Sequence, residues 1–272
     1  MTQLPSAGWL IDFKKLTVIR GTKAILSDFN LQVKRGEHVV ILGPNGSGKS
    51  TLIKLMTCDL YPQTGIKGSQ FSIFGLERWG LEDLRQHLGI VTLDLLQKLS
   101  HEVTAREVNA RDMVLSGFFN SIGLWPHHKV SSAQKRRARE ILQFLEIEHL
   151  SLRPLSAMSS GEQRRAMIGR ALVHDPEVLI LDEPTTSLDP GAVHEFYVIL
   201  RKLVRSGKSL ILVTHQVADI LPEIDRVILM KKGRIIADGP KEKILTSSAL
   251  TRLFGKKLKL IRKKQTFDLV SG

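Results

Sequence analysis

The chain has 272 residues, of which 42% are apolar and 25% charged, as in a globular protein with a large core. No apolar run reaches the ~18 residues of a transmembrane helix, and residues 1–15 lack the pattern of a signal peptide. The single cysteine, Cys58, excludes an internal disulfide and suits a reducing cytoplasm. The net charge of +13 favours an anionic partner, with a merely solvated basic surface as the alternative.

Short apolar runs predict several strands in the first part of the chain, with turns near Gly21 and Gly36. A helix is predicted at 48–58, because an apolar pattern of helical spacing begins there. From about residue 98 to 173 the pattern becomes helical, most clearly at 132–150. The strands predicted before this helical part are 13–20, 24–43, 69–75 and 87–93.

Two short apolar runs, 177–184 and 209–215, return after the helical part and have the pattern of buried parallel strands. A helix is predicted between them at 190–205, and 226–239 is predicted to form a hairpin that turns at Lys232-Gly233. Strands interrupted by a helical insert indicate an α/β fold. We expect a doubly wound sheet, an antiparallel β layer near the N-terminus and a helical subdomain.

The stretch ILGPNGSGKST, residues 41–51, contains the motif G-x-x-x-x-G-K-[ST] from Gly43 to Ser50. Its glycines allow backbone N–H groups to turn around an anion, and a helix begins where they end. Lys49 is expected to reach the β and γ phosphates of a nucleotide, and Ser50 to offer its hydroxyl to Mg²⁺. The preceding apolar strand favours this interpretation over an ordinary glycine-rich turn. The predicted phosphate-binding residues are Gly43, Pro44, Asn45, Gly46, Ser47, Gly48, Lys49, Ser50 and Thr51.

Two carboxylates end the apolar strand in VLILDEPT, residues 178–185, where strands of an open α/β sheet face the ligand. Asp182 is predicted to hold the Mg²⁺ shell, and Glu183 to act as the general base on the attacking water. His215 ends the next predicted strand and is placed to contact a γ-phosphate. Acidic residues that simply face solvent are the alternative, which the upstream phosphate motif makes weaker.

The stretch MSSGEQRRAMIGRAL, residues 158–172, begins a helix with small polar residues. Ser159, Ser160 and Gly161 are predicted to form a second anion-binding helix N-terminus. The alternative is an ordinary capped helix with a capping box from Ser160 to Gln163. Because one nucleotide has one triphosphate, a second phosphate site makes sense if it serves a nucleotide bound by another copy.

Taken together, these motifs resemble the ATP-binding cassette (ABC) ATPases, the motor subunits of ABC transporters. The order of phosphate loop, helical insert, signature, acidic strand, SLD segment and histidine matches that family over residues 8–255. The resemblance implies a single cassette with a phosphate-loop NTPase (RecA-like) core, a helical signature subdomain and a basic tail. The limits expected for these parts are 1–255 for the cassette, 1–97 and 174–255 for its core, 98–173 for the subdomain and 256–272 for the tail.

The same resemblance implies that two cassettes close head-to-tail on ATP and Mg²⁺, with a homodimer as the default. Ser159 and Gly161, with Ser160 beside them, would then contact the partner's γ-phosphate, and Asp189 would lie at the dimer seam. Catalysis would rest on Glu183 and His215. The other implied partner is an integral membrane permease.

Several positions depart from the family pattern. Arg20 stands where an aromatic residue usually stacks on the adenine, and a guanidinium can also stack on a base. Leu93 occupies the usual glutamine position after GIV, so Gln97 is the candidate contact for Mg²⁺ or water. The signature reads MSSGE, in which Ser159 and Gly161 are retained, and Gln216 follows the histidine where Asp is common.

The function predicted from sequence is ATP hydrolysis that energises transport, with import of the iron–siderophore, vitamin B12 and molybdate-associated type as the closest resemblance. The chain is expected on the inner face of the cell membrane, in the cytoplasm. The alternative is a soluble cassette ATPase that acts on nucleic acid or ribosomes, which the charge and the basic run 256–264 favour mildly. Nucleic acid is not the expected partner, and the basic run is also a candidate contact for anionic lipid.

Two further stretches remain open to more than one interpretation. By the same resemblance, residues 113–126 fall where the helical subdomain docks a permease, although Phe118, Phe119 and Trp125 are equally interpreted as core residues. The adjacent His127 and His128 are interpreted as loop residues, because no further metal ligand stands at a useful spacing.

Overall fold

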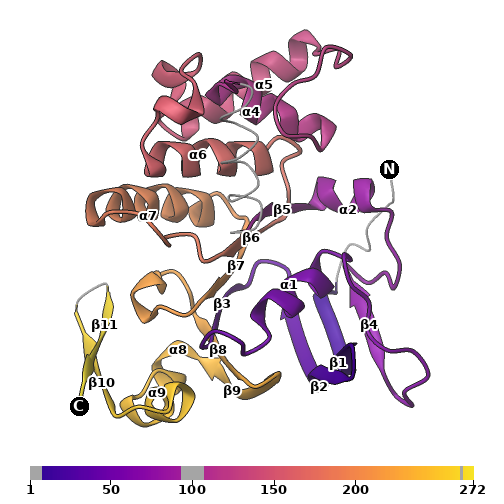
Figure 1. Cartoon of the computed structure of the whole chain (residues 1–272), viewed down its shortest axis with the longest axis vertical. Helices are drawn as coiled ribbons and strands as arrows, with labels where there is room; N and C mark the ends of the chain where they lie inside the picture. Colours follow the sequence, from indigo (N-terminus) through magenta and orange to yellow (C-terminus); the bar gives the residue numbers. More distant parts are fainter. Residues whose placement is uncertain (1–7, 93–106, 264–265) are drawn as a thin grey trace. The chain divides into compact units, whose positions relative to one another are not determined.

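The computed structural model describes residues 8–92, 107–263 and 266–272 (Figure 1). The chain divides into two compact units, which span residues 1–84 with 209–272, and residues 85–208. The second unit is therefore an insertion within the sequence of the first. The domain limits expected from sequence, with a helical subdomain at 98–173, stay a prediction.

The first unit combines an antiparallel sheet with a mainly parallel one. Strands of the antiparallel sheet have the order β2-β1-β4. In the other sheet β7, β3, β8 and β9 lie in that order, with β3 parallel to β7 and β8, and β9 antiparallel to β8. The bounds are β1 Trp9–Arg20, β2 Lys23–Lys34, β3 His38–Leu42, β4 Gln70–Ile73, β7 Ser209–Thr214, β8 Arg226–Lys231 and β9 Arg234–Pro240.

The apolar run of β3 explains its central place between β7 and β8. Its residues from Val39 to Leu42 are all 0% exposed, as expected of a parallel strand that is covered on both faces. The strand leads into the phosphate loop and α1 (Lys49–Met56), so the sheet core positions the loop. The rest of this unit consists of α8 Lys241–Ile244, α9 Ser247–Phe254, the β10 (Leu258–Arg262) and β11 (Phe267–Ser271) hairpin, and the turn Val217–Asp219.

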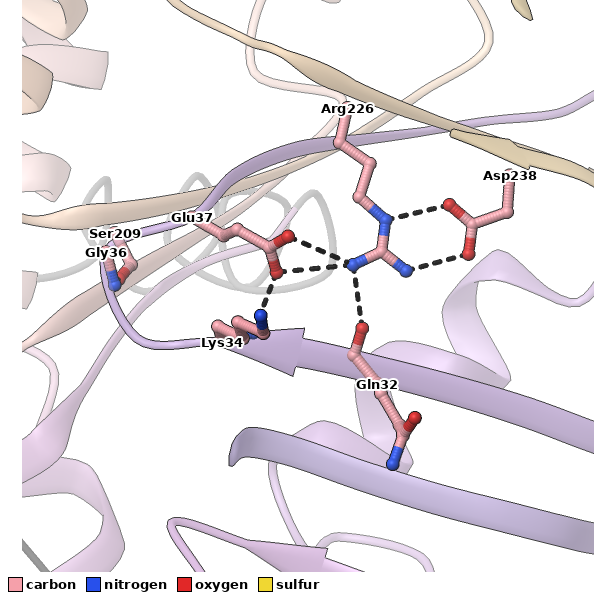
Figure 2. A network of polar contacts seen from close by, with 7 residues as sticks. All are labelled: Gln32, Lys34, Gly36, Glu37, Ser209, Arg226 and Asp238. Carbon is pink, nitrogen blue, oxygen red and sulfur yellow. Dashed lines mark hydrogen bonds and ion pairs between the residues drawn. The ribbon is translucent and has the colours of Figure 1, made fainter. Parts of the chain in front are cut away.

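A half-buried arginine network fastens β2 to the β8–β9 pair (Figure 2). Arg226 donates to both carboxylate oxygens of Asp238 at 2.8 and 2.7 Å, and to the Gln32 carbonyl at 2.8 Å. Its Nη1 also lies 3.2 Å from Glu37 Oε2, and that carboxylate accepts the Lys34 N–H. The bonds to Asp238, together with the two acidic charges, raise the pKa of Arg226 although burial opposes them. Forked contacts of this kind fix orientation as well as adding stability.

In its described residues, the second unit combines a strand pair with packed helices. Strand β5 (Leu88–Val91) runs parallel to β6 (Val178–Asp182). Helix α4 packs on α5 and α6, and α6 lies beside α7 (Figure 1). A Cβ at Gly169 would lie 2.8 Å from Val114, so this glycine allows the close approach of α6 to α4. The helix bounds are α4 Ala110–Ser116, α5 Ser132–Phe144, α6 Ser160–Ala171 and α7 Pro190–Arg205, and α2 (Leu81–His87) crosses the unit boundary.

Most strand and helix predictions are confirmed. The helix expected at 190–205 has those limits, and the predicted hairpin turns at Lys232-Gly233, both with positive φ. Within the segment 256–272, for which the sequence predicts only a basic tail, residues 258–262 and 267–271 pair as the antiparallel strands β10 and β11. In the described part of the chain, no helix has the combination of length and hydrophobicity that a bilayer span requires.

The aromatic residues of 113–126 are not part of a closed core. Phe118 and Phe119 are half-buried and Trp125 is 39% exposed, so the core interpretation is wrong for Trp125. The Phe119 ring stacks on His128 at 4.2 Å between centroids, and the Trp125 ring stacks on His127 at 6.4 Å. Both histidines therefore belong to an aromatic cluster in this loop.

Candidate nucleotide-binding site

The phosphate loop starts at a glycine that is squeezed between neighbouring strands of the first unit. The Gly43 N–H donates to the Thr214 carbonyl at 3.2 Å, which joins the loop to the end of β7. A Cβ at Gly43 would lie 2.3 Å from the Met230 carbonyl oxygen on β8, closer than real contacts permit. Only glycine fits at this position, because the obstacle is backbone.

Two further glycines turn the loop toward α1. Gly46 and Gly48 have φ of +76° and +103°, in the left-handed region that residues with a side chain rarely adopt. The turn between β8 and β9 supports the loop from outside, since the Gly233 N–H donates to the Ser47 carbonyl at 2.8 Å. The loop is thus shaped by its own glycines and held by a neighbouring hairpin.

Replacing Gly233 by Ala is expected to destabilise the first unit by more than the strain of a positive φ alone would cost. Its Cβ would lie 1.9 Å from the Ile25 carbonyl, whereas Gly36 has a similar φ of +79° and nothing within 4 Å. Gly36→Ala is therefore the matched control, with an expected cost of about 1 kcal/mol. Urea unfolding should show a loss of about 3 kcal/mol for Gly233→Ala. Equal losses in the two variants would contradict the close approach at Gly233.

Lys49 places its ammonium group inside the loop. Its side chain is 7% exposed, and Nζ donates to the Gly43 carbonyl at 2.7 Å and to the Pro44 carbonyl at 3.3 Å. The Ser47 hydroxyl is buried and finds no hydrogen-bond partner among the described residues. A cation, an unsatisfied hydroxyl and the N-terminus of α1 at one glycine-built turn fit the phosphates of a nucleotide.

The predicted histidine directly follows Thr214, a buried threonine that hydrogen-bonds the next turn of the chain. The Thr214 hydroxyl hydrogen-bonds Asp219, which is 1% exposed, and accepts the Gln216 N–H at 3.0 Å. His215 lies between these anchors and is half-buried, so its backbone is held in place. The sequence pattern did not single out Asp219, although this acidic residue lies only four positions after His215.

Two other predicted residues have different outcomes. Arg20 is the last residue of β1 and is exposed, and no described contact tests its role toward an adenine. Gln97, the candidate for the Mg²⁺ or water contact, lies outside the described residues. Both assignments stay predictions.

In the second unit, the acidic pair stands at the end of β6. Asp182 is the last residue of the strand, and Glu183 follows with φ of +49° and 6% exposure. The Glu183 carbonyl accepts the Thr186 N–H at 3.2 Å, which closes a tight turn. Asp189 caps α7, since its Oδ1 accepts the N–H groups of Gly191 and Ala192 at 2.9 and 3.0 Å.

The signature helix α6 begins one residue earlier than the sequence pattern indicated. The N-cap is Ser159, whose hydroxyl accepts the Glu162 N–H at 3.3 Å while Glu162 Oε2 accepts the Ser159 N–H at 2.7 Å. The capping box is therefore Ser159–Glu162, and the Ser160–Gln163 box named in the alternative interpretation is wrong. Burial acts to raise the pKa of Glu162, but the Ser159 bonds and nearby arginines lower it.

Close packing brings the signature next to the segment that follows the acidic pair. A Cβ at Gly161 would lie 3.0 Å from the Ala192 Cβ, so α6 meets the first turn of α7 there. Ser159, Ser160 and Asp189 are exposed around this contact. Arg164, which the sequence reading passed over, is 6% exposed and donates from Nη2 to the Thr186 carbonyl at 2.9 Å. Burial lowers the pKa of this arginine to about 10.

The structure thus assembles the predicted residues in two groups, one in each unit. The first contains the phosphate loop and His215, and the second contains Asp182, Glu183, Asp189 and the signature. A glycine-built loop between a buried strand and a helix, in a chain with a mixed α/β sheet, defines a phosphate-loop nucleotide-binding protein.

The chain belongs to the ABC transporter family, whose profile matches residues 26–186. Among its relatives, the cobalt import ATP-binding protein CbiO of Rhodobacter capsulatus is 36% identical, and the match covers 84% of this chain and 77% of the relative. The hemin import ATP-binding protein HmuV of Aliivibrio fischeri is 30% identical, with 87% of each chain covered. The Nod factor export ATP-binding protein I of Neorhizobium galegae is 33% identical, with 85% of this chain and 62% of the relative covered.

Solved structures agree with the sequence relatives. CbiO1 from Clostridium perfringens, part of the ABC transporter complex CbiONQ, has a TM-score of 0.73 at 29% identity, with 90% of this chain and 93% of that chain covered. A dimeric ATP-binding cassette in a post-hydrolysis state, bound to ADP and Pi, has a TM-score of 0.65 at 25% identity, with 85% and 98% covered. The chain is therefore an ABC transporter ATP-binding subunit with the fold predicted from its sequence.

Proposed function

We propose that the chain hydrolyses ATP and thereby energises transport through a separate membrane permease. The observation that carries the proposal is the burial of Lys49 inside a glycine-built loop, in a chain of the ABC family. An ammonium group inside such a loop attracts an anion, and a nucleoside triphosphate supplies one of matching shape.

Each predicted residue then has a distinct task. Lys49 and the backbone N–H groups of the loop bind the phosphates, while His215 contacts the γ-phosphate. Glu183 orients the attacking water and accepts its proton. Ser50 and Asp182 offer the oxygen ligands that Mg²⁺ prefers, and the bound ion neutralises phosphate charge.

We infer a head-to-tail homodimer in which each ATP is completed by the signature of the other copy. Ser159, Ser160 and Asp189 are exposed where α6 and α7 begin, so a second copy can reach them. A similar cassette forms a dimer in its solved structure. Nucleotide favours closure because only the closed dimer offers these contacts across the seam.

Replacing Ser159 by Arg is expected to block ATP-driven dimerisation while leaving binding of ATP to the monomer within about twofold of wild type. The added bulk and charge occupy the surface that would meet the partner's phosphate. Ser131→Arg is the matched control, because Ser131 caps α5 through an equivalent capping box with Gln134. The molar mass measured with ATP should reach the dimer value in the Ser131→Arg control, as in wild type, but not in the Ser159→Arg protein. A dimer in the Ser159→Arg protein would refute the head-to-tail arrangement.

Import is the proposed direction, with a metal ion or metal chelate as the proposed cargo. Two of the relatives are named for import of cobalt and hemin, which agrees with the importer group that the sequence resembles. One relative is named for Nod factor export, so direction is tested by transport itself. The proposed location is the cytoplasmic face of the cell membrane, at the permease.

A soluble ATPase acting on nucleic acid or ribosomes is the second candidate. The net charge of +13 favours it, as do the exposed Lys259 and Arg262 of the β10–β11 hairpin. The family match favours the transporter.

Phosphate release by the purified chain tests the hydrolytic part of the proposal. The rate per chain should rise with protein concentration, because two copies complete each site. A protein that binds ATP but releases no phosphate at any concentration would contradict hydrolysis.

A further inference from the structure

We propose that Arg164 is a positioning residue for ATP hydrolysis, which ties α6 to the loop 183–189 between β6 and α7. Its partner in that loop is the Thr186 carbonyl, three residues after the carboxylate assigned as general base. The inference rests on the proposed hydrolytic function and adds a residue that holds the loop carrying Glu183 in position.

The loop that Arg164 holds has a backbone that needs support. Glu183 and Ser187 have φ of +49° and +68°, although neither is glycine. Left-handed conformations cost about 1–3 kcal/mol for residues with a side chain, and persist only where the surroundings enforce them. The hydrogen bond from Nη2 to the Thr186 carbonyl, at 2.9 Å, supplies such a constraint from outside the loop.

The burial of Arg164 adds little to the stability of the fold. It is 6% exposed, and its Nη1 finds no hydrogen-bond partner among the described residues. The Thr186 hydroxyl oxygen is likewise buried and unsatisfied within the described part of the chain. Burying a guanidinium with an unused donor opposes folding, and an apolar side chain of similar volume is often as stable or more so. The benefit of Arg164 is therefore expected in the reaction.

The same helix carries the signature, so Arg164 connects the signature to the loop that contains the proposed general base. The N-cap Ser159 lies at the start of α6, and a Cβ at Gly161 would lie 3.0 Å from the Ala192 Cβ of α7. A second copy that presses its nucleotide against Ser159 would move α6, and the bond to Thr186 would pass this displacement to the loop. Glu183 would then be aligned when the dimer closes.

Arg164→Met is expected to separate turnover from stability. We expect kcat to fall by ~10-fold or more, since small misplacements of catalytic groups are costly. The affinity for ATP should stay within about twofold, and the unfolding midpoint should be unchanged or higher. Arg164→Lys, which keeps a donor of shorter reach, should be intermediate in kcat. Arg139→Met is the matched control, because Arg139 is 73% exposed and pairs with Glu148 on the surface of the same unit.

Amide hydrogen exchange of the loop is the second readout, and it does not depend on turnover. The Thr186 and Leu188 amides, bonded at 3.2 and 3.1 Å, should exchange faster in Arg164→Met than in Arg139→Met. Wild-type kcat or unchanged exchange in Arg164→Met would overturn the positioning role, as would a fall in kcat explained by unfolding. If wild type and Arg139→Met release no phosphate, the proposed hydrolysis fails, and the exchange experiment alone decides the role of Arg164.

Discussion

Replacing Glu183 by Gln should lower steady-state ATP hydrolysis by ~10²–10⁴-fold, the usual contribution of a general base. The carboxylate is 6% exposed at the end of β6, and the amide has nearly the same shape but cannot accept the proton of the attacking water. Binding of ATP should persist, because the phosphate loop is unchanged. The protein should therefore accumulate as an ATP-bound dimer, which phosphate release and molar mass measure together.

The matched control for this variant is Glu195→Gln, which removes an exposed carboxylate on α7 that pairs with Arg165. It should hydrolyse ATP at close to the wild-type rate, since surface ion pairs contribute little. Normal turnover in the Glu183→Gln protein would remove Glu183 from its assignment as the base.

Replacing Lys49 by Ala should weaken ATP binding and abolish turnover. A hydrogen bond to a charged group contributes about 1.5–3 kcal/mol, so the loss in affinity should be on the order of 10- to 100-fold. The ammonium group is fixed by the Gly43 and Pro44 carbonyls, which places it where phosphates would bind. Titration with a fluorescent ATP analogue, followed by competition with ATP, measures the affinity directly.

Lys54→Ala is the control for Lys49→Ala, because Lys54 is exposed in the last turn of the same helix. It should bind ATP as wild type does. Equal affinities of wild type and Lys49→Ala would mean that the loop does not hold the triphosphate.

The sequence predicted the parts of the site that depend on local pattern. The glycines of the phosphate loop, Lys49 and the acidic end of β6 were readable because each occurs at a fixed spacing next to an apolar run. The close approach of Gly43 to Met230 was not, since it joins residues far apart in the chain. Motif spacing indicates which residues form a turn, but not which strand presses against it.

The errors have similar physical causes. The signature helix could begin at Ser159 or Ser160 by pattern alone, and the Ser159–Glu162 hydrogen bonds decide between them. The basic residues of 256–272 concealed the alternation of Leu258 and Leu260 in β10. Arg164 looked like any charged helical residue, because its burial depends on how α6 packs against the loop after β6.

The central claim is that this ATP-binding subunit drives a membrane permease, and co-purification tests it most directly. Tagged Glu183→Gln protein would be isolated with ATP from its native cells in a mild detergent, and the proteins bound to it identified by mass spectrometry. Lys49→Ala, which should not form the ATP-bound dimer, is the parallel control. The account predicts a multi-span membrane protein in stoichiometric amount with Glu183→Gln. Ribosomal proteins or nucleic acid without a membrane partner would contradict it.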